Sequence, residues 1–104
     1  MQYLRIFGKK GEDFTRYWAS VSTEKTKDGK GTGKYMRANI SVRLSKDAEE
    51  TFKDNAVKSK SKGVKHVYGK VEGWLKAAET SEGEGYLYLF VNSIEVEESE
   101  EEED

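Results

Sequence analysis

The sequence contains no cysteine and no proline, and it has a single histidine. The absence of cysteine excludes disulfide bridges, thiolate metal sites and thiol nucleophiles. The lone His66 has only scattered carboxylates near it in sequence, which is too little for a zinc site or for a nucleophile and base pair. We therefore expect a non-catalytic protein with no metal and no cofactor, in which His66 is a surface residue of a strand.

Long apolar segments are also missing, since no run approaches the ~20 residues that a membrane-spanning helix needs. Residues 1–5 do not show the charged and then apolar layout of a signal peptide. With 104 residues there is room for one domain with a thin core. We expect an unprocessed protein of the cytoplasm that does not enter a membrane.

Charge is distributed very unevenly along the chain. All 18 lysines and arginines and 12 of the 20 acids fall in residues 1–94, whereas residues 95–104 hold eight acids and no base. A basic body with an acidic tail is typical of a domain that binds a polyanion, although a basic surface with a solubilising tail would look the same. The composition predicts a folded domain over residues 1–96 and a disordered acidic tail over 97–104.

Alternation of apolar and polar residues with a period of two predicts five strands, over residues 3–9, 14–26, 34–44, 64–77 and 86–96. The third has the clearest pattern, an apolar row made by Met36, Ala38, Ile40, Val42 and Leu44. Opposite that row the residues are polar, which indicates a strand buried on one face. Residues 27–33 and 80–85 contain glycine and are predicted hairpin connections, the first of them a flexible basic loop.

One segment changes to a helical period. Ser45 is a candidate N-cap, acids follow it in the first turn, and the apolar residues Ala48, Phe52 and Ala56 recur on one helical face. The predicted order is therefore three strands, one helix and a two-stranded hairpin. That order predicts an all-β fold, a five-stranded OB-fold Greek-key barrel with one helix between the third and fourth strands.

Two segments carry a resemblance to a known family. They are ANISVRLSKDAEETF at residues 38–52 and the closing hairpin at residues 67–96, with Gly-x-Val-x-Gly at 69–73 and a charged loop before the last strand. Together with the acidic tail they resemble the single-stranded-DNA-binding protein (SSB) family, in particular its short bacteriophage members. The chain departs from bacterial members at its tip, because it ends in Asp104 instead of an aromatic residue.

The resemblance implies sequence-independent binding of single-stranded DNA in replication or recombination, by a homodimer or homotetramer. It also implies that the acidic tail contacts replication or recombination proteins, and that a phage-encoded protein would act in the host cytoplasm.

Binding of single strands without sequence preference needs aromatic faces for the bases and a positive groove for the phosphates. On the second predicted strand Arg16 and Trp18 share the polar face, and on the third Tyr35 and Arg37 do so. We predict these four as binding residues, with stacking also on Trp74, Tyr86 and Tyr88 and phosphate contacts from Lys25, Lys27, Lys30 and Lys34. Phe7 and Phe14 stay unassigned.

Two alternatives stay open at this point. Exposed aromatic residues also mark protein interfaces, so an OB-fold adaptor whose aromatic face binds a partner protein is the second hypothesis. RNA is the alternative nucleic-acid ligand, because no residue is identified that would read a 2′-hydroxyl group.

Overall fold

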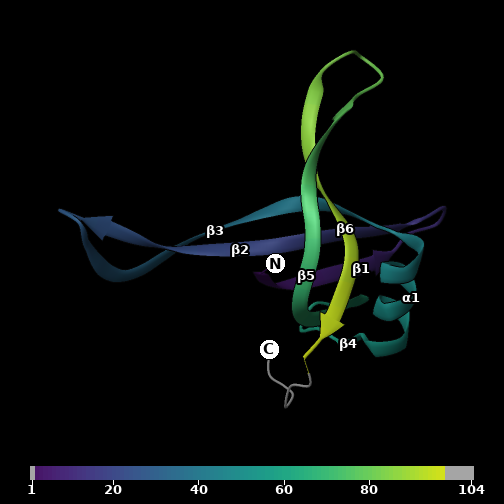
Figure 1. Ribbon diagram of the computed structural model, residues 1–104, viewed down its shortest axis with the longest axis horizontal. Helices are drawn as coiled ribbons and strands as arrows, with labels where there is room; N and C mark the ends of the chain where they lie inside the picture. The colour runs from purple at the N-terminus through teal and green to yellow at the C-terminus, as the bar shows by residue number, and fades with distance from the viewer. Residues whose placement is uncertain (1, 98–104) are drawn as a thin grey trace.

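The computed structural model describes residues 2–97, with the side chain of Gln2 left aside (Figure 1). Its elements are β1 (Gln2–Lys10), β2 (Thr15–Lys27), β3 (Lys30–Leu44), α1 (Lys46–Asn55), β4 (Val57–Lys58), β5 (Val64–Glu79) and β6 (Gly85–Val96). The predicted tail lies outside the described residues except for Glu97, whose backbone N–H donates to the carbonyl oxygen of Tyr68 at 2.9 Å. Hydrogen bonding to β5 thus continues one residue beyond the predicted end of the domain.

Five of the strands form a closed barrel in the order β1-β2-β3-β6-β5, with β5 pairing back onto β1. β3 and β6 pair in parallel, whereas β1–β2, β2–β3, β1–β5 and β5–β6 are antiparallel. The helix follows the third strand, as predicted, so the all-β OB-fold barrel is confirmed. The two-residue β4, which the sequence did not predict, pairs with the start of β5.

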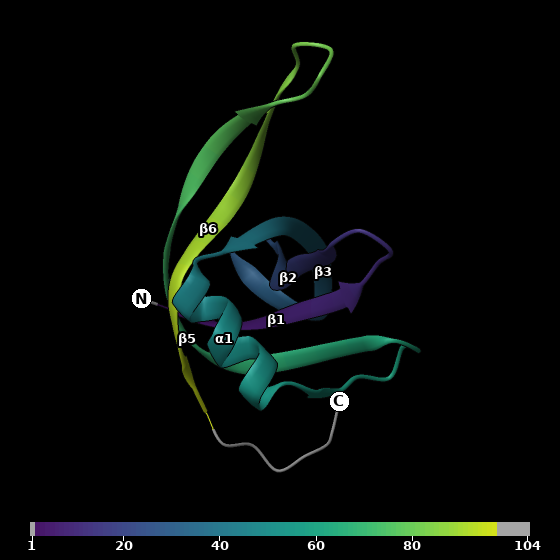
Figure 2. The same cartoon turned by 90° about the vertical axis from the view of Figure 1, so that its right-hand side faces the viewer.

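The core lies between the barrel and α1, which crosses one end of the barrel in Figure 2. Ala48 and Phe52 are buried in it, and the Ser45 hydroxyl accepts a hydrogen bond from the Ala48 N–H at 3.1 Å, as its predicted N-cap role requires. Tyr17 of β2 meets Phe52 edge-on at 5.1 Å and donates to Glu49 Oε2 at 2.8 Å. Burial, and then the bond to Glu49, raise the pKa of Tyr17 well above its usual value. The helix is thereby fixed to the sheet.

Two hairpins extend beyond the barrel in different directions (Figure 1). We call residues 21–38 the β2–β3 arm and residues 73–90 the β5–β6 arm. The predicted flexible loop at 27–33 is wrong, because pairing continues to Lys27 and Lys30 and the chain reverses at Asp28-Gly29. Both turn residues have positive φ, 55° and 79°, the geometry that Asp-Gly favours in two-residue hairpins. The basic segment is therefore the end of a paired strand.

Gly69 allows close approach between β5 and β6. It pairs with Val96, and a Cβ at this position would press against the carbonyl oxygen of Glu95, which is backbone and has no rotamer to escape into. We expect Gly69→Ala to lower the free energy of unfolding by about 1–3 kcal/mol, measured by urea denaturation. Gly85→Ala on the same hairpin is the control, since the nearest atom to its Cβ is 3.9 Å away. Equal midpoints for the two variants would contradict this reading.

Candidate nucleic-acid interface

The outer face of β1, β2 and β5 carries a line of rings. Phe7 of β1 pairs with Trp18 of β2 on one side and with His66 of β5 on the other, so the three side chains project from the same face. Two residues earlier on β1, Arg5 pairs with Tyr68, and Tyr3 pairs with Lys70. We call Tyr3, Phe7, Trp18, His66 and Tyr68 the aromatic row.

Two pairs of rings in the row are stacked with their planes close to parallel. The Phe7 and Trp18 rings are 5.8 Å apart with 9° between their planes, and Tyr3 and Tyr68 are 5.7 Å apart at 25°. His66 is tilted by 48° against Phe7 at 5.8 Å. Trp18 is half-buried and Tyr3 is exposed, so ring surface of the row meets solvent. The row offers the kind of platform on which a planar ligand stacks.

Cationic groups border the row. The Arg5 guanidinium lies 5.5 Å from the centre of the Tyr68 ring, and the Lys70 ammonium lies 5.8 Å from that of Tyr3. At the other end Lys9 pairs with Arg16, both of them exposed. Cations over aromatic faces are attracted by the ring quadrupole, which keeps these charges beside the rings.

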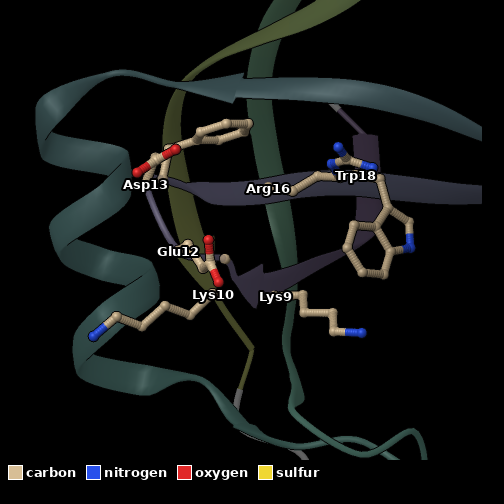
Figure 3. A pocket seen from close by; sticks show the side chains of 8 residues that line it. Lys9, Lys10, Glu12, Asp13, Arg16 and Trp18 are labelled. Carbon is tan, nitrogen blue, oxygen red and sulfur yellow. The ribbon is translucent and has the colours of Figure 1, made fainter.

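A hollow of about 590 Å³ adjoins Trp18, between the outer face and the β1–β2 turn. Figure 3 shows the side chains of Lys9, Arg16 and Trp18 extending to the same side, while Lys10 points toward the helix. The lining is Lys9, Lys10, Gly11, Glu12, Asp13, Phe14, Arg16 and Trp18. The hollow thus combines an indole with basic groups. Its two acids, Glu12 and Asp13, belong to the β1–β2 turn.

A second hollow, of about 460 Å³, shares Phe14 and Arg16 with the first. Its far wall is formed by Arg43 of β3 and by Tyr86 and Tyr88 of the β5–β6 arm. Because Phe14 and Arg16 line both hollows, we treat the two as one groove that leads from Trp18 to Tyr86 and Tyr88 of the β5–β6 arm. We call it the basic groove.

Arg43 fixes the arm to the barrel at this end of the groove. Its Nη2 donates to the Tyr86 hydroxyl at 2.8 Å, and its guanidinium lies 4.3 Å from the centre of the Tyr88 ring. The expectation that Tyr88 stacks a base needs correction, because Tyr88 is only 7% exposed and Arg43 covers its face. Tyr88 supports a guanidinium instead of offering a free ring.

The other predicted residues lie along the two arms. Tyr35 is 64% exposed on the outer face of the β2–β3 arm, where Arg37 Nε donates to Ser22 Oγ at 3.2 Å. Glu24, the partner of Tyr35, lies six positions after Trp18 on β2, a span of about 20 Å. Trp74 is on the β5–β6 arm, 49% exposed and 5.4 Å from Phe90. The predicted lysines are all at the far end of the β2–β3 arm: Lys25, Lys27, Lys30 and Lys34.

Of the predicted residues, the basic groove is therefore lined by Arg16, Trp18, Tyr86 and Tyr88, the last with its ring covered by Arg43, and the others lie along the two arms. The sequence prediction missed Tyr3, Arg5, Lys9, Arg43 and Tyr68, and it left Phe7 unassigned. A signal existed, because Tyr3, Arg5 and Phe7 alternate with Leu4 and Ile6 just as Arg16 and Trp18 alternate with core residues. The prediction of a surface position for His66 is wrong, since it is 9% exposed beside Phe7.

Within residues 2–97 no group of three or more histidine, aspartate or glutamate side chains could hold a metal ion. The described helix, α1, is too short and too polar to cross a membrane.

Comparison with known proteins finds no relative. No protein-family model matches the chain, and neither the curated proteins nor the solved structures yield a match.

The Arg43 contacts make a testable contribution to stability. We expect Arg43→Ala to lower the free energy of unfolding by about 1–2 kcal/mol, because one hydrogen bond and one cation–π contact are lost. Arg37→Ala is the matched control, since its guanidinium makes one exposed bond to Ser22. We expect its cost to stay below about 0.5 kcal/mol in urea denaturation. A cost for Arg43→Ala no larger than the control would contradict the anchoring role.

Proposed function

We propose that this protein binds single-stranded DNA without catalysis and largely without sequence preference. The observation that carries the proposal is the stacked Phe7–Trp18 pair, whose partly exposed indole lies beside Lys9 and Arg16 at the entrance of the basic groove. Stacking on an aromatic ring accepts every base, and fixed cations beside the ring match the phosphates that follow each base. OB-folds commonly bind oligonucleotides on the face of their second and third strands and in the loops next to it, and Arg16 and Trp18 lie on the second strand beside the β1–β2 turn.

The groove suggests a path for the strand. Bases would stack on Trp18 and on other exposed rings of the row, while Arg16 and Arg43 contact phosphates between Trp18 and the β5–β6 arm. Tyr35 and Arg37 would prolong the path along the β2–β3 arm toward its terminal lysines. A duplex fits this surface poorly, because its bases are already stacked and cannot reach the rings.

The adaptor hypothesis explains fewer of these features. A protein interface accounts for the exposed rings and for arginine, which is enriched in interfaces, but lysine is depleted there, whereas Lys9 and Lys70 lie beside the rings of this row. The resemblance of residues 38–52 and 67–96 to the SSB family supports a role in replication or recombination. In that role the acidic tail would contact partner proteins.

Trp18 provides a direct optical test, because the chain has two tryptophans. In Trp74→Phe the remaining emission comes from Trp18, and we expect titration with oligo-dT to quench it. Trp18→Ala should weaken binding by about 1–3 kcal/mol, the value of one stacked base, and Trp18→Phe by less because a ring remains. A loss below about 1 kcal/mol for Trp18→Ala would show that this face does not stack bases.

Arg16 tests the phosphate contact separately from stacking. Binding that releases counterions weakens as salt rises, and each phosphate contact adds about 0.7 to the slope for a single strand. We expect Arg16→Ala to reduce the slope of log K against log salt by about that amount, measured by fluorescence anisotropy of labelled oligo-dT. The control is Lys46→Ala, an exposed charge in the first turn of α1, which should leave the slope unchanged. Equal slopes for wild type and Arg16→Ala would remove Arg16 from the binding path.

A further inference from the structure

The inner faces of both arms carry apolar side chains that nothing in the described chain covers. Within the barrel these faces form the core, but the arms extend past its rim. Val21 and Met36 on the β2–β3 arm are 42% and 52% exposed, and Leu75 and Leu87 on the β5–β6 arm are 58% and 59% exposed. Cross-strand pairing places Ala38 beside Val21 and Ala77 beside Leu87 on the same faces. Monomeric proteins seldom leave a continuous surface of this kind to solvent.

Where the two arms diverge, the core opens to solvent. A hollow of about 310 Å³ at this point is lined by Leu4, Val21, Ile40, Val71, Gly73, Leu75 and Leu89, without a charged or polar side chain. Val71 belongs to the buried core, so the hollow joins the core to the arms without interruption. We call the apolar residues of the two inner faces and of this hollow the apolar cradle.

The cradle lies on the opposite side of the strands from the nucleic-acid interface. On β2 the outer residues Trp18 and Ser22 alternate with Ala19 and Val21, which face inward. A ligand on the aromatic row therefore leaves the cradle uncovered. The cradle needs an occupant of its own.

The ends of the two arms carry opposite charge. The end of the β2–β3 arm has Lys25, Lys27, Lys30 and Lys34 against Glu24 and Asp28. At the end of the β5–β6 arm, residues 79–85 hold three glutamates and no base. One arm is thus basic at its tip, the other is acidic, and both have an apolar inner face.

We propose that a second copy of this chain occupies the cradle, with the β2–β3 arm of each copy packed against the β5–β6 arm of the other. A two-fold interface must be self-complementary, and this surface meets that condition in both apolar contact and charge. Each arm pair would bury Val21 and Met36 against Leu75 and Leu87 and bring lysines to glutamates at the tips. The two-fold symmetry would make this contact between the arms occur twice in the dimer. This inference does not depend on the proposed DNA binding.

The first test measures mass in solution by light scattering across a micromolar concentration series. The unchanged protein is expected at twice its chain mass of 11.8 kDa, and Leu75→Glu with Leu87→Glu at the single chain mass. These substitutions add charge at side chains more than half exposed in the single chain, so the barrel itself should keep its circular dichroism. Val57→Glu is the matched control, because Val57 is 57% exposed on β4, away from both arms, and it should stay dimeric.

The second test exchanges charge between the tips. One variant carries Glu79→Lys, Glu82→Lys and Glu84→Lys, and the other carries Lys25→Glu, Lys27→Glu, Lys30→Glu and Lys34→Glu. Each alone pairs like charges in both contacts and is expected at the single chain mass. Mixed together they pair opposite charges in both contacts, and the two-chain mass should return. Only arm exchange between copies predicts that rescue.

Three outcomes would overturn the proposal. A single-chain mass for the unchanged protein would assign the cradle to a partner of another sequence. A two-chain mass that survives the leucine substitutions would place the dimer contact elsewhere on the surface, and failure of the mixed tip variants to associate would exclude arm exchange. None of these measurements uses DNA, so they are independent of oligo-dT binding.

Discussion

The pairing of β1 with both β2 and β5 determines most of what this surface can do. It closes the barrel, and it puts Phe7 between Trp18 and His66 in one line across three strands. Without the β1–β5 pairing Arg5 would not meet Tyr68, and the Phe7–Trp18 pair would lose His66 as its neighbour. The rings of paired residues contact one another because neighbouring strands lie about 4.8 Å apart, which brings aromatic side chains on the same face within reach.

Charge on this surface is organised by the same alternation. Residues that face away from the core are free to be cationic, and on β1 and β2 they are Arg5, Lys9 and Arg16. Arg43 differs from these three because its guanidinium lies on the Tyr88 ring and bonds to Tyr86, across the junction of barrel and arm. It contributes positive potential to the groove and also limits how far the β5–β6 arm can swing from β3. The proposed binding path thus has a fixed end.

The strands, the helix and the type of barrel were predictable from sequence, whereas the contacts between side chains far apart in the chain were not. Period-two runs and the Ser45 cap identified the barrel strands and the helix, because both patterns depend on a few consecutive residues. Which strands become neighbours is set by contacts between distant residues, so the meeting of Phe7, Trp18 and His66 escaped prediction. The same holds for Tyr88. Alternation correctly put its side chain on the face opposite Leu87 and Leu89, but the guanidinium that covers its ring belongs to Arg43 on another strand. Met36 looked like core for a related reason: the apolar row continues after the barrel has ended.

The two faces of the arms also constrain each other. Tyr35 and Arg37 face the proposed DNA path, whereas Met36 between them faces the apolar cradle, so one strand serves both surfaces through its alternation. The tip lysines can pair with DNA phosphates or with the glutamates of a second copy. Lysines that bind phosphates would no longer attract the glutamates across the contact between the arms. If both proposals hold, the apolar side chains must carry most of the association between copies while the lysines exchange partners. A dimer held by its leucines could then bind DNA without coming apart.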